Sequence, residues 1–160
     1  MKKILSLLLG VALLTGCFGM GANAEVLVQP KVSHTYTATE EFARDEWFTD
    51  QRGAYLGNGV SVISREGVNM ISISGSTNAT RYCDQVRLVL FVERSTSYAT
   101  GYGTYKMYSY SANNAYQLGK EISNIPIERG YYYRVRGVHS VTENGVIEST
   151  DSITDPLDYR

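Results

Sequence analysis

Apolar and polar residues alternate along most of the chain from residue 55 onward. Short runs rich in Val, Ile and Tyr recur between clusters of Gly, Asn and Ser, and this two-residue period is typical of half-buried β-strands. The runs predict strands at residues 59–64, 68–74, 86–93, 104–111, 116–122, 131–141 and 147–154. The run at 86–93 is apolar on both faces, as expected for a covered central strand. The pattern therefore predicts an all-β domain of about seven antiparallel strands.

Turn-forming dipeptides separate several of these runs, namely Glu66-Gly67, Asn113-Asn114 and Asn144-Gly145. Asn-Gly is a strong signal for a two-residue hairpin because both residues accept a positive φ. The last two predicted strands should therefore pair. A strict two-residue turn would place Glu148 opposite the inward-facing Val141, so we expect a bulge or a longer loop between these strands.

The first 24 residues have the order of a secretory signal. Lys2 and Lys3 precede an apolar run at residues 4–14, and small residues follow at 22–24. Glycines interrupt the apolar stretch, so it is a poor transmembrane helix, which needs roughly 20 consecutive apolar residues. We expect residues 1–24 to be a signal peptide that is removed on export.

A second cleavage site competes with the first. Leu14-Thr15-Gly16-Cys17 resembles the lipobox of bacterial lipoproteins, in which the cysteine is acylated and becomes the new N-terminus. Removal of residues 1–16 would make Cys17 a lipid anchor, whereas cleavage after Ala24 would release a soluble protein. Both alternatives predict an exported protein, either secreted or anchored on the outer face of the cytoplasmic membrane, with membrane contact only through Cys17.

Residues 25–54 show no strong period, and we expect them to form an arm that precedes a domain at 55–160. Thr37 followed by Glu40 fits a capping box before a short helix, and we expect Phe42, Trp47 and Phe48 to lie against the domain as apolar residues. After cleavage about 136 to 144 residues remain, which is the size of a single domain.

Charge and cysteine content exclude further classes of function. The formal net charge is −1 and becomes −3 when Lys2 and Lys3 are lost, and no basic stripe follows, so we expect no nucleic-acid partner. Cys83 is the single thiol left once residues 1–24 are removed, so no intrachain disulfide can form. It leads into an apolar strand and lacks the electropositive setting of a nucleophile.

The sequence offers little material for a catalytic or metal site. The two histidines are His34 and His139, and no serine nucleophile motif accompanies them, so we interpret His139 as a packed strand residue. Asp151, Asp155 and Asp158 match no calcium loop. The scattered acids show no preferred pair for glycoside hydrolysis. We therefore expect no catalytic residue, cofactor or metal, and no enzymatic activity.

Tyrosine is the least ordinary part of the composition. The chain contains 13 tyrosines, and many lie between residues 98 and 116. Alternation places Tyr108 and Tyr110 on one face, and exposed tyrosines offer rigid, amphipathic contact area. The alternative is that tyrosine occurs there only because it favours strand geometry on a partly solvent-exposed surface. We propose Tyr108, Tyr110 and Tyr132 as candidate binding residues.

Residues 131–139, Tyr-Tyr-Tyr-Arg-Val-Arg-Gly-Val-His, resemble the penultimate strand of fibronectin type III domains. The resemblance implies an immunoglobulin-like, fibronectin type III-like β-sandwich. It also places Tyr131 at the tyrosine corner, where the hydroxyl binds a backbone acceptor a few residues upstream. Pro126 and Gly130 are displaced relative to the usual Pro-Gly pair of that family.

Several segments also resemble a family of small exported proteins of Gram-positive bacteria that is known only as a domain of unknown function. They are Arg52-Gly53-Ala54-Tyr55-Leu56, Ser74-Gly75-Ser76-Thr77-Asn78-Ala79-Thr80-Arg81, residues 130–137 and Glu148-Ser149-Thr150. This resemblance supports export and supplies no catalytic residues.

These observations predict an exported, non-catalytic surface or secreted module that binds a cell-envelope polymer, a glycan or a protein. The alternatives are a small exported hydrolase without a recognisable motif, and a secreted effector or bacteriocin-like protein. An enzyme would show a cleft with convergent titratable groups, whereas a binding module would show a flat or grooved aromatic face. The sequence leaves the oligomeric state open.

Overall fold

The computed structural model describes residues 26–51 and 54–160, and the regular structure of these residues is entirely β-strand. The strands are β1 (Val26–Val28), β2 (Val32–Ala38), β3 (Phe42–Thr49), β4 (Leu56–Arg65), β5 (Met70–Ser95), β6 (Gly103–Pro126), β7 (Tyr132–Glu143), β8 (Val146–Ile153) and β9 (Leu157–Asp158). The prediction of an all-β chain is confirmed. Across the described ranges, no helix is long and apolar enough to cross a bilayer.

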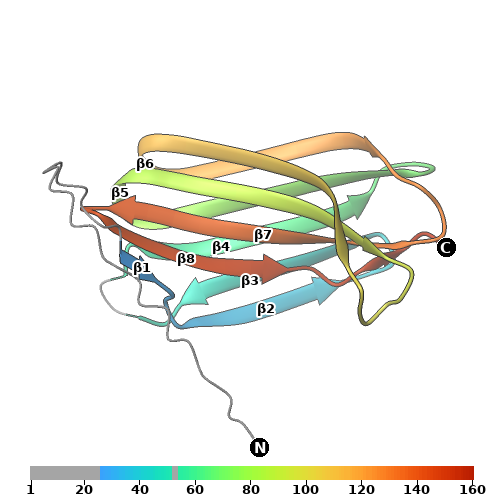
Figure 1. The fold of residues 1–160 in the computed structure, drawn as a ribbon, viewed down its shortest axis with the longest axis horizontal. Helices are drawn as coiled ribbons and strands as arrows, with labels where there is room; N and C mark the ends of the chain where they lie inside the picture. The colour runs from blue at the N-terminus through green and yellow to red at the C-terminus, as the bar shows by residue number, and fades with distance from the viewer. Residues whose placement is uncertain (1–25, 52–53) are drawn as a thin grey trace, which may run out of the picture.

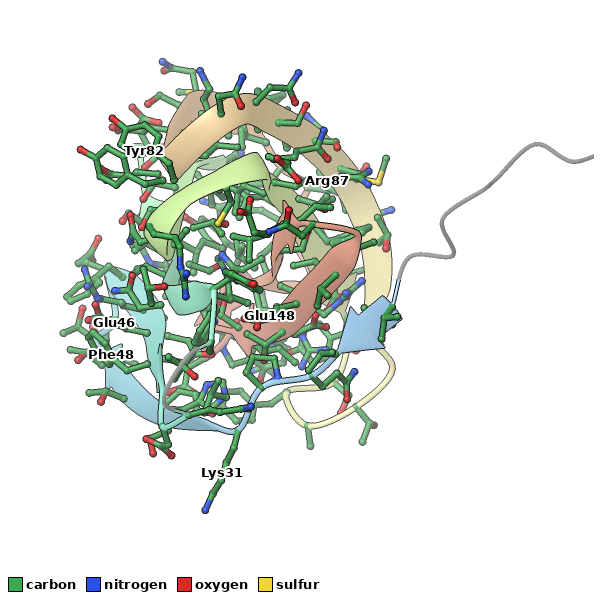
Figure 2. The ribbon with its side chains drawn as sticks, turned by 90° about the vertical axis from the view of Figure 1, so that its left-hand side faces the viewer. Lys31, Glu46, Phe48, Tyr82, Arg87 and Glu148 are labelled. Carbon is green, nitrogen blue, oxygen red and sulfur yellow. The ribbon has the colours of Figure 1, made fainter. Side chains whose placement is uncertain are left out.

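The strands form one curled sheet in the order β1-β8-β7-β5-β4-β3-β2, with β6 paired along β5 and β9 paired to β7. β1 and β8 are parallel, so the sheet is mixed. Seen end-on, the sheet curves around its core as a half-barrel (Figure 2). An immunoglobulin-like sandwich of seven antiparallel strands is not confirmed, because a single continuous sheet supplies both walls of the core.

The curl comes from two long strands, β5 and β6, which run to one end of the molecule, bend there and return (Figure 1). Each contains two of the predicted strands joined together. β4 pairs with the first half of β5 and β7 with the second, and the register between β5 and β6 shifts between Asn78 and Cys83. Asn114 lies next to this shift, between the residues that pair with Cys83 and Gln85, and has a φ of 47°. The Asn113-Asn114 signal therefore marks a bend within β6, where the sequence predicted a turn between two strands.

The hairpin between β7 and β8 is the strict two-residue turn for which Asn144-Gly145 is suited. Glu143 pairs with Val146, and the two turn residues have φ values of 51° and 77°. The predicted bulge is wrong, because Glu148 does lie opposite Val141 and is buried.

The N-terminal segment expected as an arm contributes β1, β2 and β3, and all three belong to the sheet. The predicted short helix is wrong, since β3 occupies its place. Thr39 instead forms the β2–β3 turn, where its Oγ1 accepts hydrogen bonds from the N–H groups of Glu41 and Phe42 at 3.2 and 3.1 Å. In β3 the inward positions include the polar Asp45, which weakens the apolar alternation from which a strand is predicted.

The core lies between the two walls of the half-barrel and consists of inward-facing side chains of every long strand. Its largest fully buried members include Trp47, Tyr133, Leu56, Ile63, Ile73, Leu88 and Leu90. Two glycines let the walls approach each other. A Cβ on Gly59 would lie 2.6 Å from atoms of Trp47 and His139, and one on Gly137 would lie 2.1 Å from Ser61 Oγ.

The tyrosine corner is present but is formed by a different residue. The Tyr133 hydroxyl donates to the carbonyl of Glu128 at 2.9 Å and accepts from its N–H at 3.0 Å. Tyr131 is half-buried with its ring edge-on to Tyr133. The expectation for Tyr131 is therefore corrected to Tyr133, two residues later on the same inward face.

Candidate functional site

The tyrosines proposed from the sequence do not form an exposed face. Tyr108 and Tyr110 pair with Leu90 and Leu88 of β5, face inward and pack half-buried against the core. Tyr132 is 8% exposed, beneath Tyr98. The candidate lipid anchor, Cys17, and both cleavage sites lie outside the described residues.

Exposed aromatic rings instead gather at the bend between the halves of β5 and β6. Tyr82 is 68% and Tyr116 49% exposed, and their rings meet edge to face with centroids 5.0 Å apart. Thr80, two residues before Tyr82, is anchored to the segment before β4. Its N–H donates to Tyr55 O and its Oγ1 donates to Ala54 O, both at 2.8 Å. The tyrosine pair is therefore held at a defined place on the surface.

A row of amide side chains crosses the sheet on the same outer face. The register pairs Phe48 with Asn58, Asn58 with Asn78, and Asn78 with Gln117, across β3, β4, β5 and β6. Asn78 Nδ2 donates to Asn58 Oδ1 at 2.7 Å. Phe48, at the far end of the row, is 49% exposed, and Figure 2 shows it and Tyr82 projecting from the same side of the half-barrel.

We name this surface the tyrosine–amide face and define it as Phe48, Asn58, Asn78, Tyr82, Tyr116 and Gln117. Three strand intervals of about 4.8 Å give the row from Phe48 to Gln117 a length of roughly 14 Å. The outward positions beside it carry Ser72, Ser74 and Ser76 on β5 and Val60, Val62 and Ser64 on β4. On β3 the neighbouring Glu46 is paired with Arg44 at 2.7 Å. A depression of about 370 Å³ lies between Tyr82, Tyr116 and Gly119. The face combines aromatic rings with uncharged donors and acceptors.

A cleft of about 510 Å³ lies at one end of the half-barrel, where the β2–β3 turn, the β5–β6 loop and the C-terminal residues meet. We name it the end cleft. The carboxylates of Glu40, Glu41 and Asp155 line it, together with the ring of Tyr98, which is 56% exposed. The loop is ordered by its own hydrogen bonds, including one from the Tyr102 hydroxyl to Tyr98 O at 2.9 Å.

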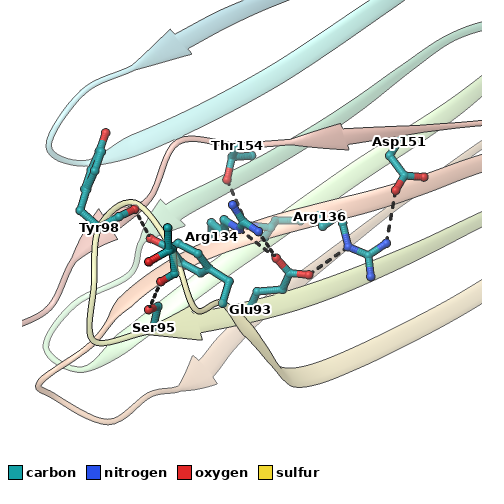
Figure 3. A network of polar contacts seen from close by, with 10 residues as sticks. Glu93, Ser95, Tyr98, Arg134, Arg136, Asp151 and Thr154 are labelled. Atoms are coloured by element: carbon teal, nitrogen blue, oxygen red, sulfur yellow. Dashed lines mark hydrogen bonds and ion pairs between the residues drawn. The ribbon is translucent and has the colours of Figure 1, made fainter.

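A charged network lies beneath this loop (Figure 3). Glu93 is 6% exposed and accepts hydrogen bonds from Arg134 Nε at 2.8 Å and Arg136 Nε at 2.9 Å. Arg136 also reaches Asp151 at 3.3 Å. The Arg134 guanidinium lies 3.9 Å from the centre of the Tyr102 ring, and burial raises the pKa of Tyr102 to about 12. These charges satisfy one another and support the loop.

His139 is fully buried, as the alternation predicted. Its Nδ1 lies 3.0 Å from Thr77 Oγ1 and its Nε2 lies 2.8 Å from Ser152 Oγ, which in turn donates to Ser61 Oγ at 2.6 Å. Burial lowers the pKa of His139 to about 3, so the imidazole is neutral at physiological pH. A histidine and two serines thus meet in the interior and satisfy each other's polar groups.

The other titratable candidates have structural partners. His34 Nδ1 lies 3.0 Å from the buried carboxylate of Asp45, which also accepts the Ile153 N–H at 2.7 Å and so joins β3 to β8. Cys83 is buried, and burial raises the pKa of its thiol. Hydrogen bonds from Arg160 lower the pKa of Asp158 to about 2. Within residues 26–51 and 54–160, no three His, Cys, Asp or Glu side chains form a group suited to a metal ion.

The sequence signal for the tyrosine–amide face was an interruption of the alternation. Residues 79–82 fit neither neighbouring strand pattern, and Tyr82 lies in that interruption because the β5 register shifts there. The amide row depends on the register of four strands, and pairings between β3 and β6 are set by contacts far apart along the chain. Sequence reasoning therefore missed it.

Comparison with known proteins gives one match. Neither the curated proteins nor the solved structures contain a significant match to the chain. A protein family described as a family of unknown function, DUF6147, matches residues 21–156, which is most of the chain and includes every residue of the tyrosine–amide face. The chain therefore belongs to the family of unknown function DUF6147.

Proposed function

We propose that the protein is an exported, non-catalytic module that binds an extended, uncharged polymer, a glycan of the cell envelope, along the tyrosine–amide face. The observation that carries the proposal is the placement of exposed rings at both ends of a row of amides: Phe48 at one end and the Tyr82–Tyr116 pair at the other. Export rests on the signal-like order of residues 1–24, with Cys17 as the alternative lipid anchor.

The chemistry of the face suits a sugar chain. The C–H faces of a sugar ring are apolar and lie against aromatic rings, while its hydroxyl groups both donate and accept hydrogen bonds, as the side-chain amides of Asn78 and Gln117 do. The row carries no charged side chain of its own, which favours a neutral ligand over a polyanion. Its length of roughly 14 Å, taken from the strand spacing, spans more than one sugar unit.

We also propose a fold relation and an origin for the chain. Residues 131–139 support a distant relation to immunoglobulin-like and fibronectin type III-like domains, since Tyr133 forms the corner hydrogen bonds of that strand. An origin in Gram-positive bacteria rests on the resemblance of several segments to small exported proteins of that group.

The proposal is tested by retention of the purified protein on insoluble envelope glycans. The double variant Tyr82→Ala with Tyr116→Ala should lose most of the retention, because both rings are exposed and contribute contact area, while the thermal midpoint stays close to that of the wild type. Asn78→Ala should weaken retention further by removing the centre of the row. Tyr98→Ala is the matched control, since it removes an equally exposed ring at the end cleft.

Three results would contradict the proposal. Full retention by the folded double variant would exclude the tyrosine–amide face as the glycan site. Release of soluble sugar from the polymer, abolished by Glu40→Gln with Glu41→Gln, would favour an exported hydrolase whose carboxylates lie in the end cleft. Loss of retention in Tyr98→Ala but not in the double variant would place the ligand in the end cleft instead.

A further inference from the structure

The sheet has open edges, and they differ in how they are protected. β6 carries Lys106 and Lys120, ends at Pro126 and pairs irregularly with β5, with several register shifts. Charges, proline and bulges are the features by which natural edge strands avoid pairing with other chains. β1 is protected by its length of three residues.

β2 has none of these features. Its seven residues, Val-Ser-His-Thr-Tyr-Thr-Ala, contain no proline, lysine or carboxylate, and its register with β3 runs without a shift from Val32 to Ala38. Val, Thr and Tyr favour strand geometry. Six of the seven residues are exposed, and Tyr36 is 58% exposed. β2 is therefore a regular edge strand without proline, lysine or carboxylate, and it is exposed along most of its length.

The hydrogen bonds at the ends of the β2–β3 pair show which backbone groups are free. Asp50 N–H donates to Lys31 O at 2.9 Å, and Thr39 N–H donates to Phe42 O at 2.8 Å. Hydrogen-bonded positions alternate along an antiparallel pair, so Ser33, Thr35 and Thr37 direct their backbone groups toward β3. The N–H and C=O groups of Val32, His34, Tyr36 and Ala38 consequently point outward from the open edge.

We propose that a second copy of this chain pairs with β2 through its own β2, in an antiparallel register centred on Thr35. In this register His34 of each copy lies opposite Tyr36 of the other, and Ser33 lies opposite Thr37. The four outward-directed residues of each copy then meet the same four of the other in hydrogen-bonded pairs. The two Thr35 residues face each other as a non-hydrogen-bonded pair.

The side chains of β2 make this register self-complementary. Within one copy the rings of His34 and Tyr36 are already stacked, with centroids 5.7 Å apart and an interplanar angle of 8°. Pairing would place two such stacks side by side, and it would bring Thr against Thr and Ser against Thr on the outer face, which are favourable cross-strand pairs. β2 itself carries no carboxylate, and the neighbouring Asp50 and Asp45 are already bound by Ser33 and His34 of the same copy. Because a seven-residue strand gives a small interface, the dimer should be reversible and concentration-dependent.

This inference is independent of the proposed glycan binding, since β2 contributes no residue to the tyrosine–amide face. An axis through Thr35, perpendicular to the sheet, nevertheless relates the two copies. It would leave both tyrosine–amide faces on the same side of one continuous sheet. Such a dimer could engage one polymer at two places, and the second contact would be intramolecular.

Sedimentation analysis of the exported chain carrying Cys17→Ser tests the proposal. The mass should rise from monomer to dimer with concentration. Thr35→Glu should restore the monomer, because it places two carboxylates opposite each other, next to Glu46 of each copy. Thr104→Glu is the matched control, since it adds the same charge at an exposed position of the β6 edge. Circular dichroism establishes that both variants remain folded.

Cross-linking tests the register. In the Cys17→Ser background the one remaining thiol, Cys83, is buried. Thr35→Cys should form an intermolecular disulfide readily, because Cβ atoms of directly opposed residues lie within reach of one. Thr37→Cys should not, because it faces Ser33. A monomer at every concentration, a dimer that Thr35→Glu leaves intact, or equal cross-linking of Thr35→Cys and Thr37→Cys would each overturn the proposal.

Discussion

Glu148 on β8 accepts a hydrogen bond from the backbone N–H of Leu56 on β4, with 2.7 Å between Oε2 and N. The two residues belong to opposite walls of the half-barrel, and both are buried. Leu56 adjoins the register shift between β4 and β5. The carboxylate of Glu148 thus satisfies a backbone donor at an irregular point of the sheet, and this contact explains why a glutamate occupies an inward position.

Replacement of Glu148 by alanine should leave the Leu56 N–H buried without an acceptor. We expect Glu148→Ala to lower the free energy of unfolding by about 1 to 3 kcal/mol, the usual cost of a buried unsatisfied polar group. Glu148→Gln should lose less, because its amide oxygen can accept the same bond. Urea denaturation measures both, with Glu121→Ala on the exposed face of β6 as control. Equal stability of Glu148→Ala and the wild type would show that water replaces the carboxylate.

Glu148 also shows where prediction from the sequence reached its limit. Alternation gave the strand correctly, and Asn144-Gly145 gave the hairpin, but an inward glutamate looked like a register error because its partner, Leu56, is 92 residues away along the chain. Asp45 obscured β3 for the same reason, since it is buried with His34 and the Ile153 N–H as partners. Polar residues in the interior are explained by contacts that no local pattern contains.

The long strands illustrate a second limit. The pattern located the apolar runs of β5 and β6 well, and it interpreted the interruptions between them as turns. Residues 79–82 and Asn114 instead form a bulge and a bend, and a bulge keeps the chain in the sheet while it redirects the strand. The exposed Tyr82 and Tyr116 lie at that place. The candidate site was therefore missed where the fold departs from regular alternation.

The tyrosine corner provides a comparison of two neighbouring positions. Tyr133→Phe should lower the free energy of unfolding by roughly 1 to 2 kcal/mol, because its hydroxyl makes two hydrogen bonds to Glu128. Tyr131→Phe is the matched control and should have a smaller effect, since its ring is half-buried and its contacts are mainly through the ring face. Thermal unfolding of both variants measures the difference. A larger loss in Tyr131→Phe would contradict the assignment of the corner to Tyr133.

Gly137 should not tolerate a side chain because of a steric clash, and a second substitution should relieve part of that clash. A Cβ at this position would lie 2.1 Å from Ser61 Oγ. We expect Gly137→Ala to cost about 1 to 3 kcal/mol, the range for overpacked interiors. Adding Ser61→Ala removes the nearest atom and should recover part of that loss, measured as a coupling energy in a double-mutant cycle. Additive effects of the two substitutions would show that the strain lies elsewhere.

The buried imidazole of His139 should make the protein sensitive to mild acid. Burial lowers its pKa to about 3, whereas the unfolded chain titrates near 6.5. Between these values the unfolded state binds a proton that the folded state does not. The contribution of His139 to stability is therefore complete above pH 6.5 and is lost as the pH falls toward 3, by up to about 1.4 kcal/mol per pH unit.

Urea denaturation between pH 7 and pH 5, above the range in which ordinary carboxylates titrate, should show this slope in the wild type. His139→Gln can still contact Thr77 and Ser152 but binds no proton, so its stability should vary less with pH over the same interval. An equal slope in the two proteins would mean that His139 is not the residue that couples folding to pH.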